Sequence, residues 1–179
     1  EIFIQYPKHT GLANAYYHKL TGDDKIDRAM LHYEIYMRTY IINLLHINNP
    51  YSFTALGSAI AFPVWAYRKI SGISPKYNGE DFYLLQQLRK IGSLLLDSGE
   101  TVYPATRLST RVDVGTGPAL IKGIAKNWNS YPIYPISLFE NIKHTFDLFA
   151  ILFEQDIETP MTAFLRSQFK CDDLWSSLR

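Results

Sequence analysis

The chain has 179 residues, of which 47% are hydrophobic and 20% charged, a balance typical of one globular domain with a core. Its formal net charge is +1 and no block of Lys and Arg occurs, which argues against a nucleic-acid partner. The single cysteine, Cys171, excludes an internal disulfide and a cysteine-based zinc site, and it fits a reducing, cytoplasmic compartment. No apolar run approaches the roughly 20 residues of a membrane-spanning helix, so no transmembrane segment is expected.

The first residues predict a chain cut from a longer protein. It begins Glu1-Ile2-Phe3-Ile4-Gln5, without an initiator Met or a signal-peptide pattern, and a trimmed tag or propeptide is the alternative. Residues 2–4 are expected as a short strand. Residues 10–20 are expected as a short helix, which Gly22 would end.

The strongest helix prediction covers residues 21–48. Apolar side chains recur there at helical spacing, and a second apolar stripe predicts a helix covered on two sides. Thr21 and Asp24 have the spacing of a capping box, and Glu34 and Arg38 form a favourable i,i+4 pair. The first stripe comprises Ile26, Ala29, Met30, Tyr33, Met37, Tyr40, Ile41, Leu44 and Leu45, and the second comprises Leu31, Ile35 and Ile42.

The middle of the chain alternates short predicted elements with loops. Residues 51–62 are expected as a strand that enters a small-residue turn, and residues 63–70 as a short helix with Pro63 in its first turn. A loop over 71–79 leads to a helix over 80–91, whose leucines share one face and which Gly92 ends.

The last third of the chain also alternates short predicted elements with loops. In chain order we expect short strands near 94–96 and 101–103, a loop over 104–118, a helical turn over 119–126, a helix over 137–153, and a last helix with Thr159 as N-cap and Pro160 at its first position. These elements predict an α+β, mostly helical single domain over residues 1–179.

Two adjacent carboxylates, Glu80 and Asp81, open the helix over 80–91. Acidic residues in a first helical turn are favoured by the helix dipole alone, so the pattern by itself fits a purely structural role. The functional alternative is a carboxylate beside a cleft, placed to take a proton from an attacking hydroxyl.

The surrounding order of motifs favours the functional alternative. A turn, Gly57-Ser58-Ala59, is followed by a helix ending in Lys69-Ile70-Ser71-Gly72, a loop, Gly79-Glu80-Asp81 and a Leu-rich helix that closes with Arg89-Lys90-Ile91-Gly92. This order resembles the acceptor-side half of family 2 glycosyltransferases, which share the GT-A nucleotide-sugar fold. The run from Ile26-Asp27-Arg28-Ala29-Met30 to Gly115-Thr116-Gly117-Pro118-Ala119 resembles a bacterial subgroup, and the resemblance covers roughly residues 20–120.

The resemblance implies roles for individual residues. Asp81 would be the catalytic base of an inverting transfer from a nucleotide-sugar to a sugar or lipid-linked acceptor. Glu80 would bind the acceptor or orient Asp81. The acceptor cleft would include Gly57, Ser58 and Trp65.

Two arginines, Arg107 and Arg111, lie in the loop that follows. Guanidinium groups suit diphosphate recognition, and the corresponding loop of this fold often covers the donor. A solvated loop with one structural salt bridge is an equally good interpretation of the sequence.

The chain also departs from the family pattern. Ser71-Gly72 stands where a Gly-Gly pair is usual, and no Gln-x-x-Arg-Trp motif follows, so a polymer-extruding synthase is not expected. The nucleotide-binding half is absent, and with it the Asp-x-Asp motif that holds a divalent cation, Mn or Mg, and the donor diphosphate. We therefore expect the cation to bind mainly outside this chain, no metal ligand within it, and no activity from the chain alone.

Other interpretations stay open. In the fold that the resemblance implies, a histidine late in the chain can ligate the metal, and His144 is the only late histidine here. Its helical context favours a surface or interhelical role. The chain could instead be a non-catalytic helical interaction module that forms a homo-oligomer. A hydrolase is the weaker third class, because glycosidases need two separated carboxyl groups and adjacent residues do not easily flank one bond.

Overall fold

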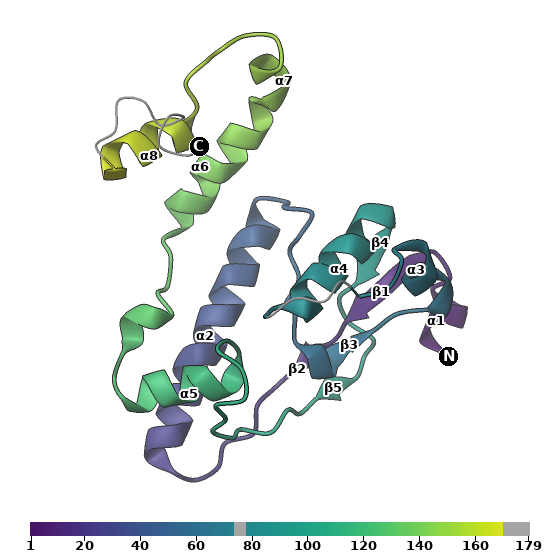
Figure 1. Cartoon of the computed structure of the whole chain (residues 1–179), viewed down its shortest axis with the longest axis vertical. Helices are drawn as coiled ribbons and strands as arrows, with labels where there is room; N and C mark the ends of the chain where they lie inside the picture. The colour runs from purple at the N-terminus through teal and green to yellow at the C-terminus, as the bar shows by residue number, and fades with distance from the viewer. Residues whose placement is uncertain (74–77, 170–179) are drawn as a thin grey trace. The chain divides into compact units, whose positions relative to one another are not determined.

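The computed structural model describes residues 1–73 and 78–169 and shows an α+β chain made mainly of helices, as the sequence predicts. The helices are α1 (Ile2–Gln5), α2 (Asp24–His46), α3 (Val64–Lys69), α4 (Glu80–Ile91), α5 (Thr116–Ile124), α6 (Ile136–Asp147), α7 (Phe149–Leu152) and α8 (Pro160–Phe169), with 3-10 turns at Gly57–Ala59 and Trp128–Ser130. The strands are β1 (His9–Ala13), β2 (Ala15–Tyr16), β3 (Ile60–Ala61), β4 (Ser93–Leu95) and β5 (Thr101–Val102) (Figure 1).

The chain divides into two compact units. One comprises Glu1–Ile42 and Pro50–Ile133, and the other comprises Asn43–Asn49 and Tyr134–Arg179. The first unit contains every strand of the described residues and every site residue that the sequence predicts.

A three-stranded sheet is the centre of the first unit, with β1 between β3 and β4. β1 pairs antiparallel with β3 and parallel with β4, and β2 forms a separate parallel pair with β5. Helix α4 packs on this sheet, because a side chain at Gly11 of β1 would begin 3.0 Å from Leu88 of α4. The hydroxyl of Thr10 also donates a hydrogen bond to the Leu88 carbonyl at 2.9 Å. These contacts hold α4, and so the carboxylates at its start, against the sheet.

A second core joins α2 to α5. It contains Ala29, Met30, Tyr33 and Met37 from α2, and Ala119 and Leu120 from α5. A side chain at Gly123 would begin 2.6 Å from the Cβ atom of Ala29, so the two helices approach closely because this residue is glycine. The last turn of α5 is thereby held against the N-terminal part of α2.

Two predictions for the N-terminal residues are wrong. Residues 2–4 lie in the short helix α1, which buries none of its side chains. Residues 10–20, predicted as a helix, contain β1 and β2. Thr10 to Ala13 are all buried, and a strand covered on both faces lacks the alternation that would reveal it.

Helix α2 confirms the strongest helix prediction, but its start and its outer face differ from the expectation. The cap is Asp23, whose carboxylate accepts hydrogen bonds from the backbone N–H groups of Lys25 and Ile26 at 2.9 and 3.1 Å. The second apolar stripe is not covered within the described chain. Its members are exposed to 42% at Leu31, 51% at Ile35 and 62% at Ile42.

The remaining elements follow the predictions with shifted limits. α4 matches its predicted range, and α3, β4 and β5 lie within or close to theirs. The strand predicted over 51–62 is reduced to β3, because the chain turns at Gly57–Ala59. Residues 116–118, predicted as loop, open α5, and the helix predicted over 137–153 is divided into α6 and α7.

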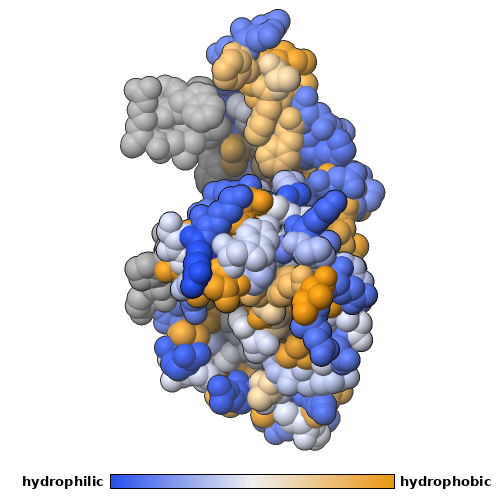
Figure 2. All heavy atoms as spheres, turned by 90° about the vertical axis from the view of Figure 1, so that its right-hand side faces the viewer, coloured by the Kyte–Doolittle hydropathy of each residue, from blue (hydrophilic) through white to orange (hydrophobic). Residues whose placement is uncertain are grey.

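The second unit is helical. The hydroxyl of Thr159 accepts a hydrogen bond from the N–H of Thr162 at 3.1 Å, which confirms the predicted N-cap of α8. α8 is joined to α6 through Thr145, whose hydroxyl accepts a hydrogen bond from the N–H of Met161 at 3.2 Å. Exposed apolar side chains gather on α6 and α7, the helices at the upper end of Figure 2. No helix within 1–73 or 78–169 combines the length and apolar character needed to cross a membrane.

Candidate functional site

A cleft of about 740 Å³ in the first unit brings together residues that lie far apart in the sequence. Its walls come from the turn before β3, the start of α4, and the loop that leads into α5, while Tyr33 of α2 also lines it. Six of the seven sequence-predicted site residues line this cleft, namely Gly57, Ser58, Glu80, Asp81, Arg107 and Arg111. Trp65 is not among the described lining residues and lies on α3, with 47% of its surface exposed.

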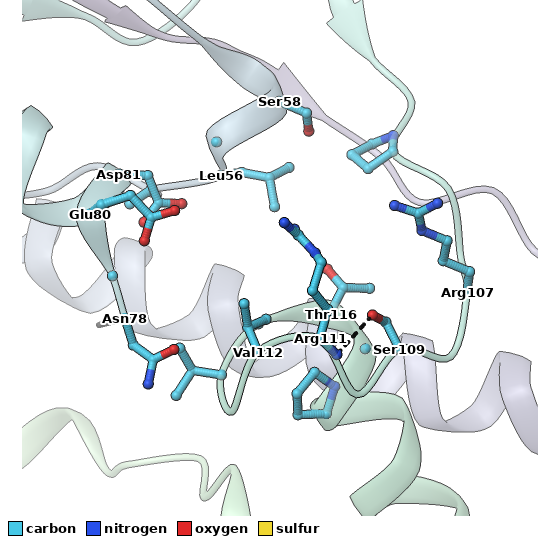
Figure 3. A pocket seen from close by; sticks show the side chains of 18 of the residues that line it. Leu56, Ser58, Asn78, Glu80, Asp81, Arg107, Ser109, Arg111, Val112 and Thr116 are labelled. Atoms are coloured by element: carbon cyan, nitrogen blue, oxygen red, sulfur yellow. Dashed lines mark hydrogen bonds between the residues drawn. The ribbon is translucent and has the colours of Figure 1, made fainter. Parts of the chain in front are cut away.

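The acidic wall is built by the first turn of α4. Gly79 precedes the helix with φ at 75°, a left-handed conformation that glycine adopts without strain. Figure 3 shows the side chains of Glu80 and Asp81 on the same side of the cleft. A side chain at Gly57 would begin 3.5 Å from the Oδ2 atom of Asp81, so this glycine leaves the space beside the carboxylate open.

The surroundings of Asp81 raise the pKa of its carboxyl group. Burial is the largest cause, because it disfavours the charged form, and the neighbouring Glu80 adds to it by repulsion. Hydrogen bonds from the backbone N–H groups of Phe82 and Gly57 partly oppose the rise. The result is a carboxylate that is more basic than an exposed aspartate and is held in a defined position.

The basic wall lies across the cleft. Figure 3 shows the guanidinium groups of Arg107 and Arg111 extending into the cleft from the loop before α5. Neither arginine takes part in an ion pair with a carboxylate in the described chain, which differs from the salt bridge that one interpretation of the sequence expects. Both positive groups are therefore available to a ligand.

Close packing holds this loop against α5. A side chain at Gly117 would begin 2.6 Å from the carbonyl oxygen of Ser109 and 2.9 Å from its nitrogen. The hydroxyl of Ser109 accepts a hydrogen bond from the backbone N–H of Arg111 at 3.3 Å. The backbone that carries the arginines therefore rests on the first turn of α5.

Two further contacts tie the loop to the segment after β2. Near the start of the loop, the Thr106 hydroxyl donates a hydrogen bond to the Lys19 carbonyl at 2.7 Å. At its end, Oγ1 of Thr116 lies 3.2 Å from Nε2 of His18. Consecutive residues, His18 and Lys19, thus anchor the two ends of the loop.

His18 is itself fixed by a buried polar network. Its side chain is fully buried, and Nδ1 lies 2.5 Å from Oε1 of Glu34, which also accepts the backbone N–H of His18 at 3.0 Å. Glu34 forms an ion pair with Arg38, and Arg38 donates a hydrogen bond to the Tyr16 carbonyl at 2.9 Å. This network joins β2 and α2 to the start of α5.

The network also determines the protonation of His18. Burial lowers the pKa of the imidazole, and the positive charge of Arg38 lowers it further. A neutral ring that donates from Nδ1 to Glu34 must accept at Nε2, so the Thr116 hydroxyl is the donor in their contact.

Three site residues escaped the sequence analysis: Tyr33, His18 and Thr116. Tyr33 belonged to the predicted apolar stripe, but nothing in that pattern distinguishes a cleft residue from a core residue. His18 and Thr116 have no local motif. The Glu34–Arg38 pair is predictable from its spacing, but that spacing does not show that the Glu34 side chain is only 8% exposed and bonds a third polar partner.

Neither the possible metal ligands of the described residues nor comparisons with known proteins assign a cofactor or a family to the chain. In residues 1–73 and 78–169, no three His, Cys, Asp or Glu side chains gather into a group that could hold a metal ion, and His144 is exposed on α6. Cys171 lies outside the described residues. No protein-family model, curated protein or solved structure matches the chain.

Proposed function

We propose that this chain forms the acceptor side of an inverting glycosyltransferase, which moves a sugar from a nucleotide-sugar to an acceptor hydroxyl. The observation that carries the proposal is a single cleft in which the desolvated carboxylate of Asp81 faces the guanidinium groups of Arg107 and Arg111. A basic carboxylate opposite a site for negative charge is what this reaction needs. The resemblance of the motif order to family 2 glycosyltransferases supports the same function.

In the proposed reaction, Asp81 takes the proton of the acceptor hydroxyl as its oxygen attacks the anomeric carbon. The new glycosidic bond forms as the bond to the nucleoside diphosphate breaks on the opposite face, which inverts the anomeric configuration. Arg107 and Arg111 bind the departing diphosphate and balance its negative charge. Glu80 raises the basicity of Asp81 and binds the acceptor at the edge of the cleft.

A divalent cation, Mn or Mg, would supply further charge neutralisation at the diphosphate. The described residues do not group into a site for it, so every step above is assigned to side chains of this chain. Trp65, which lies outside the cleft, receives no role.

The test is sugar transfer by the full-length product of the gene. Nucleotide-sugars and acceptors are screened with Mn²⁺ or Mg²⁺, and released nucleoside diphosphate is measured. We expect Asp81→Asn to reduce transfer by about 10²- to 10⁴-fold, the usual contribution of a general base. Glu100→Gln, an exposed carboxylate outside the cleft, is the matched control and should retain activity. Undiminished transfer by Asp81→Asn would contradict the assignment.

A helical oligomerisation module remains the second candidate, and one observation favours it. Leu31, Ile35 and Ile42 are exposed on α2, the longest helix of the described chain. If a second copy covers them, sedimentation velocity should show a dimer that Ile35→Glu converts to monomer. A monomer at all protein concentrations would reject this candidate.

A further inference from the structure

The inner lining of the cleft contains a polar group that the mechanism above does not use. Tyr33 lies in the middle of α2, only 9% exposed, and it also lines the cleft. Tyr33 therefore shares the cleft with the carboxylates of the acidic wall and the arginines of the basic wall.

The ring of Tyr33 is held by other aromatic side chains. Tyr36 stacks on it with a centroid distance of 6.2 Å, and Tyr131 meets it edge-on at 5.1 Å. The same residue belongs to the core that joins α2 to α5. Because the ring is packed in this core, the hydroxyl is the polar group that Tyr33 offers to the cleft.

The Tyr33 hydroxyl has no hydrogen-bond partner among the described residues and is not fully buried. No residue within 1–73 or 78–169 forms a hydrogen bond with it, and the oxygen differs from the fully buried unpaired atoms of these residues because it keeps some accessible surface. A hydroxyl that is accessible in the cleft and not bonded within the described chain is available to a molecule that enters the cleft.

The surrounding charges narrow the chemistry of that molecule. Burial is the largest cause that raises the pKa of Tyr33 above its ordinary value, and the neighbouring tyrosines and Asp81 raise it further. Tyr33 therefore stays protonated and donates. Its partner must accept a hydrogen bond near the negative charge of Asp81, which disfavours a phosphate or carboxylate and favours a neutral oxygen. A sugar hydroxyl meets this requirement, because it accepts from a phenol and also donates to a carboxylate.

We propose that the Tyr33 hydroxyl binds a hydroxyl group of a neutral sugar ring held in the cleft beside Asp81. Tyr33 is thus a binding residue for the acceptor, and the acceptor is a carbohydrate at the point where it enters the cleft. This inference rests on the proposed function and deepens it by naming the substrate class.

The test measures binding of simple probes to the whole chain. Methyl glycosides of glucose, galactose, mannose and N-acetylglucosamine are titrated against the protein labelled with ¹³C at the tyrosine Cζ atom. Tyr33→Phe removes only the hydroxyl and identifies the Tyr33 resonance. Tyr36→Phe is the matched control, because Tyr36 belongs to the same aromatic cluster but is not among the described residues that line the cleft.

We expect at least one glycoside to shift the Tyr33 resonance, and Tyr33→Phe to weaken its binding about fivefold, as for one neutral hydrogen bond. Tyr36→Phe should leave the affinity unchanged. Equal affinity of the wild type and Tyr33→Phe overturns the inference, and so does a wild type that binds none of these glycosides.

The two proposals fail separately. If Asp81→Asn abolishes transfer while Tyr33→Phe does not affect glycoside binding, the transferase stands and the role of Tyr33 is wrong. If glycosides bind through Tyr33 but no nucleotide-sugar is turned over by the full-length protein, the carbohydrate site stands and the transferase is wrong.

Discussion

The Nε2 atom of His18 lies 3.2 Å from Oγ1 of Thr116, although 98 residues separate them in the chain. On its other side the same imidazole bonds Glu34 of α2. One buried ring therefore connects the segment after β2, helix α2 and the first turn of α5. The position of the basic wall depends on this connection.

Removing His18 should destabilise the protein. His18→Ala leaves the buried Glu34 oxygen without its imidazole partner, a loss of about 1–3 kcal/mol in the free energy of unfolding. Urea denaturation checks this, with His144→Ala on the exposed face of α6 as the control. Because the pKa of His18 is lower in the folded state than in the unfolded state, the unfolded state takes up a proton at a higher pH when the solution is acidified. The contribution of His18 should therefore be complete above its ordinary pKa of 6.5 and decrease as the pH falls below that value.

Replacing Asp81 should stabilise the protein while it removes activity. The raised pKa means that the folded state binds a proton more tightly than the unfolded state, so ionisation of Asp81 lowers stability as the pH rises above the ordinary value of 3.8. Asp81→Asn removes that cost and can still accept the N–H groups of Phe82 and Gly57. The thermal midpoint of the variant should exceed the wild-type value at neutral pH and approach it in acid. A lower midpoint at neutral pH would show that the carboxylate is stabilising.

The pH dependence of transfer should report the pKa of Asp81. The rate should rise with pH along a limb that lies above the range of an ordinary aspartate, because only the ionised form accepts a proton. Glu80→Gln removes the neighbouring negative charge and should move this limb to lower pH. Glu100→Gln should leave it in place. A limb that does not respond to Glu80→Gln would assign the ionisation to another group.

Two glycines of α5 offer a matched pair of substitutions. Gly117→Ala places a methyl group 2.6 Å from the carbonyl of Ser109, and Gly123→Ala places one 2.6 Å from Ala29. Both should lower stability, by about 1–3 kcal/mol, because a well-packed interior resists added volume. Only Gly117→Ala moves the arginine loop, so it alone should also raise the KM for the nucleotide-sugar. Equal effects on KM would mean that the loop is not held by this contact.

The arginines should contribute to donor binding rather than to folding. Arg111→Gln is expected to raise the KM for the nucleotide-sugar about 10- to 100-fold, the range for a charge-assisted hydrogen bond. Arg68→Gln, an exposed arginine on α3 outside the cleft, should leave KM unchanged. Thermal midpoints should be similar for the two variants. An unchanged KM for Arg111→Gln would mean that the loop is solvated and does not bind the donor.

Local patterns predicted the acidic wall, because its determinants lie close together in sequence. The apolar face of α4, the glycine before it and the two carboxylates in its first turn all lie within residues 79–91. The prediction that Gly57 and Ser58 share a cleft with Asp81 came from the order of the motifs, and both residues do line the same cleft as Asp81.

The remaining features depend on partners that no local pattern names. β1 is buried along most of its length, so its residues show neither strand nor helix periodicity. The two hydrogen bonds that anchor the arginine loop join residues separated by 87 and by 98 positions in the sequence. Tyr33 belongs to the same apolar stripe as its neighbours on α2, and only the fold places it at the cleft. Long-range packing of this kind becomes visible only in three dimensions.

The loop between Thr106 and Thr116 is tied at both ends to adjacent residues, Lys19 and His18. Its ends therefore stay together whatever lies between them, and the entropic cost of lengthening such a closed loop grows only logarithmically. The segment that carries Arg107 and Arg111 should accordingly tolerate a change in length at a small entropic cost. Changes in this loop could alter which ligands the cleft binds while the sheet and α4 stay the same.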